Sequence, residues 1–341
     1  MVDACPLARL FPGARPAGEN EDNGALLDLI VRALPADRLQ TAAAAARPFA
    51  LAAAGVAPEA CTRPEAWYGD AMARGHLPAL RWYWAAAPAH YPQTAETASH
   101  AAARGQLVVL QWLRAKGCPW TASTCDLAAE HGHLEVLQWA RAQGCEWTQR
   151  TCDTAAKRGH LAVLQWARAH GCAWSHWTCD KAAMNGHLHV LRWARDHGCA
   201  WTSNTCDLAA ENGHLGVLQW ARAFGCPWTV NTCDKAAENG HLAALQWSRA
   251  RGCAWSLRAC DYAASHGRLD VLQWARAQTP PCPWSHRTCD LATANGHLAA
   301  LQWARAQGCA WTHRAYDLAA ENGHAEVAAW AHENGCPAAP A

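Results

Sequence analysis

Apolar side chains recur with a helical period in two short segments that alternate along most of the chain. In the first, exemplified by residues 150–158, the small side chains of Cys152, Ala155 and Ala156 follow an i, i+3, i+4 spacing and share one helix face. The second, exemplified by residues 161–169, has a bulkier apolar face made of Leu161, Val163, Leu164, Trp166 and Ala167. The pattern predicts pairs of short amphipathic helices that pack through these faces.

A Gly-His-Leu marker separates the two segments and shows that the pair is copied. The marker begins at Gly75, Gly132, Gly159, Gly186, Gly213, Gly240 and Gly296, with degenerate copies at Gly105, Gly267 and Gly323. The step is 27 residues from Gly105 to Gly267, 29 residues up to Gly296, and 30 residues for the first copy. The full phrase reads W-[TS]-x-x-T-C-D-x-A-A-x-x-G-H-L-x-V-L-Q-W-A-R-A-x-G-C. These ten units predict a repeat domain over residues 62–341.

Each unit carries signals for both ends of its first helix. The Thr or Ser after the junction Trp is a favoured N-cap, at Thr121, Thr148, Ser175, Thr202, Thr229, Ser256, Ser285 and Thr312. The Asp of Thr-Cys-Asp falls near the positive end of the helix dipole, and the marker Gly suits a left-handed C′ position. Helices of roughly ten residues are marginal alone, so stability must come from stacking. We predict an all-α solenoid of stacked helix-turn-helix units.

The copies differ mainly along one stripe of the first helix, at positions i, i+4 and i+7. These positions hold Arg150, Thr154, Lys157; Trp177, Lys181, Met184; Asn204, Leu208, Glu211; Asn231, Lys235, Glu238; and Arg258, Tyr262, Ser265. A constant frame with one varied stripe is typical of a modular binding surface. We therefore expect these side chains to be exposed and to contact a protein partner.

The phrase A-A-x-x-G-H-L-x-V-L…G-C resembles the ankyrin repeat, A-A-x-x-G-H-x-x-V-V…G-A, and the likeness recurs in all ten units. The resemblance implies protein–protein binding through the first helices and a marker His that hydrogen-bonds backbone between units. Ankyrin units have about 33 residues, whereas these have 27 and lack the stretch that forms the family's β-hairpin finger. The short form is similar to repeats in proteins of large DNA viruses and of protists. Without fingers, the stripe has to carry more of the binding.

Charge and motif content narrow the function classes. The 29 basic and 28 acidic residues give a net charge of +1, which argues against a nucleic-acid or anionic-membrane binder. No P-loop, dinucleotide motif or His-Glu-x-x-His occurs, so we expect neither an enzyme nor a bound cofactor. Asp3 stands where a basic signal-peptide region would be. We expect a cytoplasmic protein, in the host cytoplasm if the chain is viral, and the nucleus stays open.

Cysteine recurs twice per unit, and with the marker His it gives Cys-x6-Cys-x7-His. These are zinc ligand types, so a Cys/His metal array is one interpretation. The spacing is not that of a zinc finger, and the Cys positions match family positions that hold buried Ala and Leu. We favour buried structural thiols and no metal site.

Two further residue series recur once per unit. We expect the junction Trp residues to pack one unit onto the next, whereas Trp177, off-pattern and on the stripe, is a candidate hot spot. The second-helix arginines, such as Arg141 and Arg168, could meet phosphates or pair with the Asp series. The near-zero net charge favours pairing or solvation.

The N-terminal residues do not follow the repeat. Residues 1–22 are rich in Pro, Gly and Ala and are predicted to be disordered. Residues 23–61 have helical patterns whose spacing resembles a degenerate F-box. In that interpretation the adaptor-binding residues are Leu26, Leu27, Ile30, Leu34, Leu39 and Phe49. The opening Leu-Pro of the motif is absent, and we favour a helical cap that shields the end of the stack.

Three functions follow from these patterns. The favoured one is a non-enzymatic protein-binding module that uses the stripe. The F-box interpretation instead implies an adaptor that docks a Skp-type protein and recruits substrates to a cullin-type ubiquitin ligase. The third is the Cys/His metal array.

Overall fold

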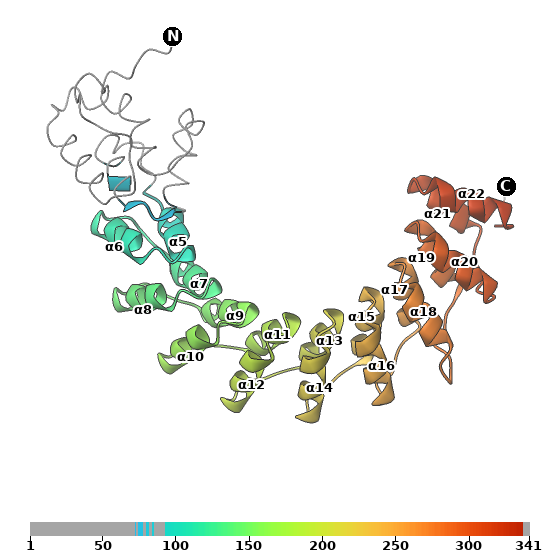
Figure 1. The fold of residues 1–341 in the computed structure, drawn as a ribbon, viewed down its shortest axis with the longest axis horizontal. Helices are drawn as coiled ribbons and strands as arrows, with labels where there is room; N and C mark the ends of the chain where they lie inside the picture. Colours follow the sequence, from blue (N-terminus) through green and yellow to red (C-terminus); the bar gives the residue numbers. More distant parts are fainter. Residues whose placement is uncertain (1–71, 73, 78–79, 82–83, 85–92, 337–341) are drawn as a thin grey trace, which may run out of the picture. The chain divides into compact units, whose positions relative to one another are not determined.

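The computed structural model describes residues 72, 74–77, 80–81, 84 and 93–336, and every element in that part of the chain is a helix (Figure 1). The chain falls into two compact units, Met1–Thr151 and Cys152–Ala341. None of the described helices is long and apolar enough to cross a membrane.

The described helices form pairs that follow the predicted repeats. Unit 1 holds α5 (Ala95–Ala103), α6 (Leu107–Ala115), α7 (Ala122–Glu130) and α8 (Leu134–Ala142), and α9 (Gln149–Arg158) crosses the unit boundary. Unit 2 continues with α10 (Leu161–Ala169), α11 (His176–Met184), α12 (Leu188–Asp196), α13 (Ser203–Glu211), α14 (Leu215–Ala223), α15 (Val230–Asn239) and α16 (Leu242–Ala250). It ends with α17 (Arg258–Ser265), α18 (Leu269–Arg276), α19 (His286–Ala294), α20 (Leu298–Ala306), α21 (Arg314–Glu321) and α22 (Ala325–Glu333).

Within unit 2 the odd-numbered first helices form one row and the even-numbered second helices form another (Figure 1). Consecutive first helices contact one another; for example, α11 packs against α13, and α13 packs against α15. Each first helix also packs on the second helix of its own pair. The predicted all-α stack of helix-turn-helix repeats is therefore confirmed for the described residues.

The predicted helix ends are confirmed with two corrections. Thr202 and Thr229 are N-caps that accept backbone N–H groups and complete capping boxes. The glycines that end the helices have positive φ, +72° at Gly213 and +83° at Gly225.

The corrections concern two N-caps that the sequence places wrongly. Ser256 and Thr312 precede α17 and α21, but these helices begin later, after Leu257 and His313. In both repeats an Ala replaces the Thr that completes a capping box, and the Ser256 and Thr312 hydroxyls donate to an Asp of the preceding repeat.

The core consists of the two predicted apolar faces. Cys152, Ala155 and Ala156 are fully buried, as are the equivalent residues of the neighbouring first helices. In the second helices, the Val163, Leu164 and Ala167 positions are buried. Leu161 and Trp166, which the sequence also assigns to the core, are only half-buried, whereas Trp112, the equivalent of Trp166 in α6, is buried. Small residues in the first helices let the repeats approach closely.

The marker His joins consecutive repeats, as the resemblance implies. His187 Nε2 lies 3.1 Å from the carbonyl oxygen of Lys157, His214 Nε2 lies 3.1 Å from that of Met184, and His297 Nε2 lies 3.0 Å from that of Ser265. A carbonyl can only accept, so Nε2 carries the proton. In one degenerate repeat Arg268 replaces the His, and its Nε donates to the carbonyl of Glu238 at 3.4 Å.

The Asp of Thr-Cys-Asp also joins repeats, a role that the sequence does not predict. The Thr151 hydroxyl donates to Asp126 Oδ1 at 2.6 Å, and Thr205 donates to Asp180 Oδ1 at 2.5 Å. Where the next repeat has Ala259 in place of this Thr, Asp234 accepts from the Ser256 hydroxyl at 2.5 Å instead. The Asp side chain therefore accepts from the next repeat whichever hydroxyl is present.

The Arg and Trp series form a second set of inter-repeat contacts. Arg222 Nη1 donates to the carbonyl of Cys226 at 2.6 Å, and its guanidinium lies 4.0 Å from the ring centroid of Trp228. Trp228 also meets Trp247 of the next second helix edge-on, with centroids 6.0 Å apart. The predicted packing role of the junction Trp is confirmed. The predicted Arg–Asp pairing is wrong, because the aromatic face and a backbone carbonyl engage the guanidinium.

The N-terminal predictions lie outside the described residues. These are the disordered segment 1–22 and the cap or F-box of residues 23–61, with Leu26, Leu27, Ile30, Leu34, Leu39 and Phe49. They stay predictions, as does the start of the repeat domain at residue 62.

Candidate functional site

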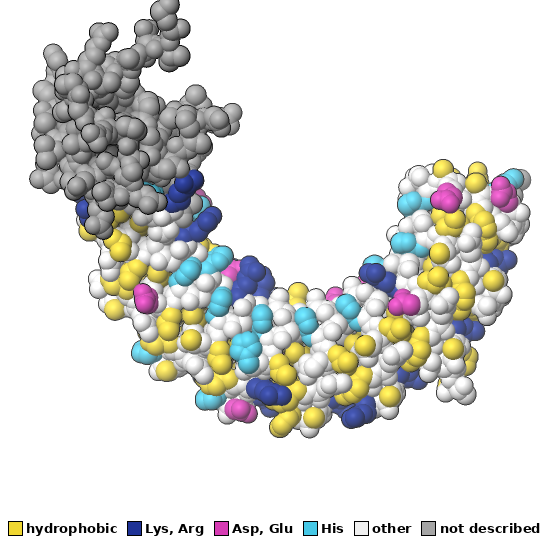
Figure 2. Space-filling view, viewed as in Figure 1, with side chains coloured by type: hydrophobic (Ala, Val, Ile, Leu, Met, Phe, Trp, Pro, Cys, Tyr) yellow, Lys and Arg dark blue, Asp and Glu magenta, His cyan; other side chains and the backbone are white. Residues whose placement is uncertain are grey.

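The stripe residues lie at the surface of the first helices. Arg150, Trp177, Asn204, Asn231 and Arg258, at the first position, are exposed. The second position (Thr154, Lys181, Leu208, Lys235, Tyr262) and the third (Lys157, Met184, Glu211, Glu238, Ser265) are half-buried, and no stripe residue is buried. Histidine side chains also follow the row of first helices in Figure 2. The fold thus presents the variable positions to solvent, and their role in binding stays a prediction.

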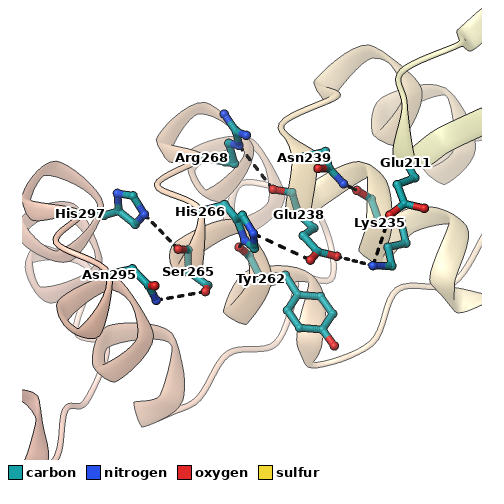
Figure 3. Close-up of polar contacts among 10 residues, drawn as sticks. All are labelled: Glu211, Lys235, Glu238, Asn239, Tyr262, Ser265, His266, Arg268, Asn295 and His297. Carbon is teal, nitrogen blue, oxygen red and sulfur yellow. Dashed lines mark hydrogen bonds and ion pairs between the residues drawn. The ribbon is translucent and has the colours of Figure 1, made fainter. Parts of the chain in front are cut away.

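Three helices of unit 2 bring charged stripe residues together around Glu238 (Figure 3). Lys235 Nζ lies 2.9 Å from Glu238 Oε2 in α15 and 3.6 Å from Glu211 Oε1 in α13. The hydrogen bond to Glu238 is the main cause that raises the pKa of Lys235. From α17, His266 Nε2 lies 3.9 Å from Glu238 Oε1. This part of the stripe is therefore largely neutralised by its own side chains.

Trp177 and Lys181 lie one turn apart on α11. The indole is 43% exposed, and Lys181 Nζ lies 5.7 Å from its ring centroid. The centroid of the His176 imidazole lies 5.2 Å from that of the indole. Cation–π contact at this distance orients a side chain weakly, so the ring keeps an open face.

The cysteines are buried structural thiols in the described repeats. Contact with Cys172, followed by burial, raises the pKa of Cys152, and Cys199 does the same for Cys179. Cys226 Sγ lies 3.3 Å from the carbonyl of Thr202, so it joins the end of its repeat to the start. No group of three or more His, Cys, Asp or Glu side chains within the described residues could hold a metal ion. The metal-array interpretation therefore has no ligand cluster to support it there.

The buried Asp series also has perturbed acidity. Burial raises the pKa of Asp180 and Asp207, and hydrogen bonds from Thr205 and Thr232 partly offset that effect. Perturbed carboxyls can mark active sites. Here each one belongs to the stacking contacts between repeats, so the arrangement offers structural acceptors and no acid–base pair.

The last repeat has a surface hollow that the sequence analysis missed. A cavity of about 560 Å³ lies between α21 and α22, lined by Tyr316, Ala320, Gly323, Ala325, Ala328, Ala329, His332 and Glu333. Tyr316 stands where earlier repeats have a buried Cys, and Ala325 and Ala328 replace the two leucines. Those three departures from the repeat phrase are the signal that could have found it.

Together, the helix pairs and the contacts that recur between them define an all-helical stack of short helix-turn-helix repeats in the described residues. No family model matches the chain, and no curated protein matches it. Among solved structures, the human ASB11 ankyrin repeat domain is similar, with 17% identity over 55% of this chain and 99% of that chain, at a TM-score of 0.43.

Proposed function

We propose that the chain is a non-enzymatic protein-binding scaffold that holds its partner on the stripe of the first helices. The observation that supports this proposal is the contrast between the buried residues, which recur in each repeat, and the stripe residues, which differ between repeats. Between Trp177 and Lys181 lie Thr178, Cys179 and Asp180, which are buried and recur in the neighbouring repeats. The exposed positions around them change from copy to copy. Varied exposed positions over constant buried supports are the arrangement of modular repeat binding surfaces.

Copies of one frame suit this function physically. Each repeat contacts only its neighbours, so a stripe side chain can be changed with little effect on the stack. Rigid helices also hold their side chains in place before binding, which lowers the entropy cost of association. The stripe mixes apolar, basic and acidic residues, which gives each repeat its own contact chemistry.

A capture experiment with the full chain tests this function. Proteins bound from a eukaryotic extract would be quantified by mass spectrometry for the wild type and for a W177A/N204A/L208A variant. The control is Q219A/Q246A, which changes exposed residues of the second helices. We expect the stripe variant to lose about tenfold or more of a specific partner, and the control to retain it. Equal losses in both variants, or none in either, would contradict binding through the stripe.

The adaptor role is a finer proposal that rests on residues 23–61. A Skp-type protein and a cullin should copurify with the full chain and should be lost in an L26A/L27A/I30A variant. The stripe variant should keep both while losing the substrate partner. If neither protein copurifies with the wild type, the N-terminal segment is a cap and the chain is a plain binding module.

A further inference from the structure

The stripe has a section in α9 and α11 whose chemistry differs from the rest. Trp177 is 43% exposed, and it is the only exposed large hydrophobic side chain at a stripe position in the described residues. The frame does not need an indole there, because the equivalent residues Asn204 and Asn231 are polar. Exposed apolar area is unfavourable in water, so an indole held open to solvent at a variable position points to a contact made outside the chain.

Two lysines share this section of the stripe with the indole. Lys181 lies one turn beyond it, and Lys157 lies one repeat earlier, where its carbonyl oxygen is 3.1 Å from His187 Nε2. Neither ammonium is within ion-pair distance of a carboxylate among the described residues. The carboxylates below them are engaged elsewhere, since Asp153 accepts a hydrogen bond from Thr178 at 2.6 Å and Asp180 is fully buried. This section of the stripe is therefore cationic at its surface.

In the next section of the stripe, a lysine is paired with carboxylates. Lys235, at the position equivalent to Lys181, is bridged to Glu211 and Glu238. The same repeat structure thus holds one lysine with ion pairs, Lys235, and one, Lys181, without them in the described part of the chain. The difference lies only in the neighbouring stripe residues. Lys157 and Lys181 have no ion pair among the described residues and lie on the same section of the stripe as an exposed indole. This combination selects for a partner with complementary charge.

Resting on the proposed function, we propose that Lys157, Trp177, Lys181 and Met184 bind an acidic protein segment that carries a large apolar side chain. Trp177 supplies rigid contact area of the kind that dominates binding hot spots. Met184, half-buried two turns further along α11, offers an adaptable apolar contact. Lys157 and Lys181 pair with carboxylates of the segment, whereas Lys235 in the next section is already bridged to Glu211 and Glu238.

The test uses the full chain and a phage-displayed library of random peptides as the probe. Peptides are selected on the wild type, sequenced, and measured against three variants. These are K157Q/K181Q, W177N, which installs the residue of the equivalent positions, and K235Q as the matched control. We expect selected peptides rich in Asp and Glu beside aromatic or aliphatic residues. Their affinity should fall about tenfold in the first two variants, equal to about 1.4 kcal/mol, and less than about twofold in K235Q.

Other outcomes separate the failure of this inference from that of the proposed function. Basic or uncharged peptides that lose affinity in N204A/L208A overturn the acidic-segment proposal and leave stripe binding standing. Peptides that bind all stripe variants equally overturn both. A selection that yields no acidic peptides, or an equal loss in K235Q, also overturns the inference. All variants should keep the wild-type melting profile, because none of the substituted side chains is buried.

Discussion

The imidazole of His241 occupies the space that a side chain on Gly213 would need. Its Nδ1 lies 2.5 Å from the position of a Cβ atom on that glycine, and the same ring hydrogen-bonds to the backbone of Glu211. The marker Gly is therefore fixed by two demands at once. Its φ of +72° favours glycine, and the next repeat fills the only room for a β-carbon.

Alanine substitutions at Gly225 and Gly213 should separate the cost of the positive φ from the cost of the missing space for a β-carbon. Gly225 has a φ of +83°, but no described neighbour comes within 4 Å of the place that a β-carbon would take, so Gly225→Ala should cost only the left-handed strain, about 1–2 kcal/mol. Gly213→Ala adds a clash with His241 and should lower the urea midpoint clearly further. Lys235→Ala serves as the surface control. Equal midpoints for the two glycine variants would show that the His241 ring moves aside without cost.

The hydroxyl donors to the Asp series give a second matched pair. Asp207 accepts from both Thr232 and Thr229, whereas Asp234 has Ser256 as its only hydroxyl donor in the described residues. Ser256→Ala should therefore cost about 1.5–3 kcal/mol, more than Thr229→Ala.

Both changes in that pair also remove a contact to a backbone N–H. Because Thr229→Ala additionally removes an N-cap, a larger loss in the Ser256 variant can be attributed to the carboxylate. Chemical denaturation at pH 7 measures it. A larger loss in the Thr229 variant would contradict the assignment.

The marker histidines should make stability depend on pH. Desolvation lowers the pKa of His187 in the fold, while its contact with the Lys157 carbonyl partly opposes this. The ring is neutral in the folded state, so its contribution is complete above the unfolded pKa of about 6.5 and is lost as the pH falls below it.

Gln106 stands at the marker His position of one degenerate repeat, which makes His187→Gln a suitable variant. The stability advantage of the wild type over this variant should shrink between pH 7.5 and 5. The buried Asp residues act in the opposite direction but are common to both proteins, so they cancel in the difference. An advantage that stays constant or grows towards acid would refute a neutral folded ring.

Thiol labelling should report burial repeat by repeat. Contact with a second thiol and burial raise the pKa of Cys152, Cys179 and Cys233. Cys118 through Cys309 are all buried and so out of reach of the reagent; peptides that contain them should resist iodoacetamide in the native protein and react on unfolding. Cys336 is only half-buried and should react first. Rapid native labelling of the central repeats would contradict the packed core.

The sequence predicts the parts of this fold that repeat with a simple period. Cys152, Ala155 and Ala156 were placed in the core by spacing alone, and the Gly and His of the marker were placed at the turn by their backbone preferences. The buried face of a helix and the residue that ends it follow from local sequence, so they can be predicted without knowing how the repeats stack.

The contacts between repeats were harder to predict, because they join residues about one period apart. Asp126 was assigned to the helix dipole, yet it accepts from Thr151, 25 residues further on. Arg222 was expected to pair with Asp or solvent, yet it lies over Trp228. Both errors arise because the alternative partners have compatible charge, and only the stacking geometry decides which one is within reach.

The carbonyl groups that the marker histidines engage belong to stripe residues. Lys157 and Met184 each place a half-buried side chain on the stripe and offer a carbonyl oxygen to the histidine of the next repeat. Recognition and assembly thus meet at the same peptide units. A partner bound to these side chains would act on the same peptide groups that hydrogen-bond to the marker histidines. A tightly bound partner should therefore slow the separation of neighbouring repeats. Under the proposed function, a bound partner should therefore raise the force needed to separate neighbouring repeats.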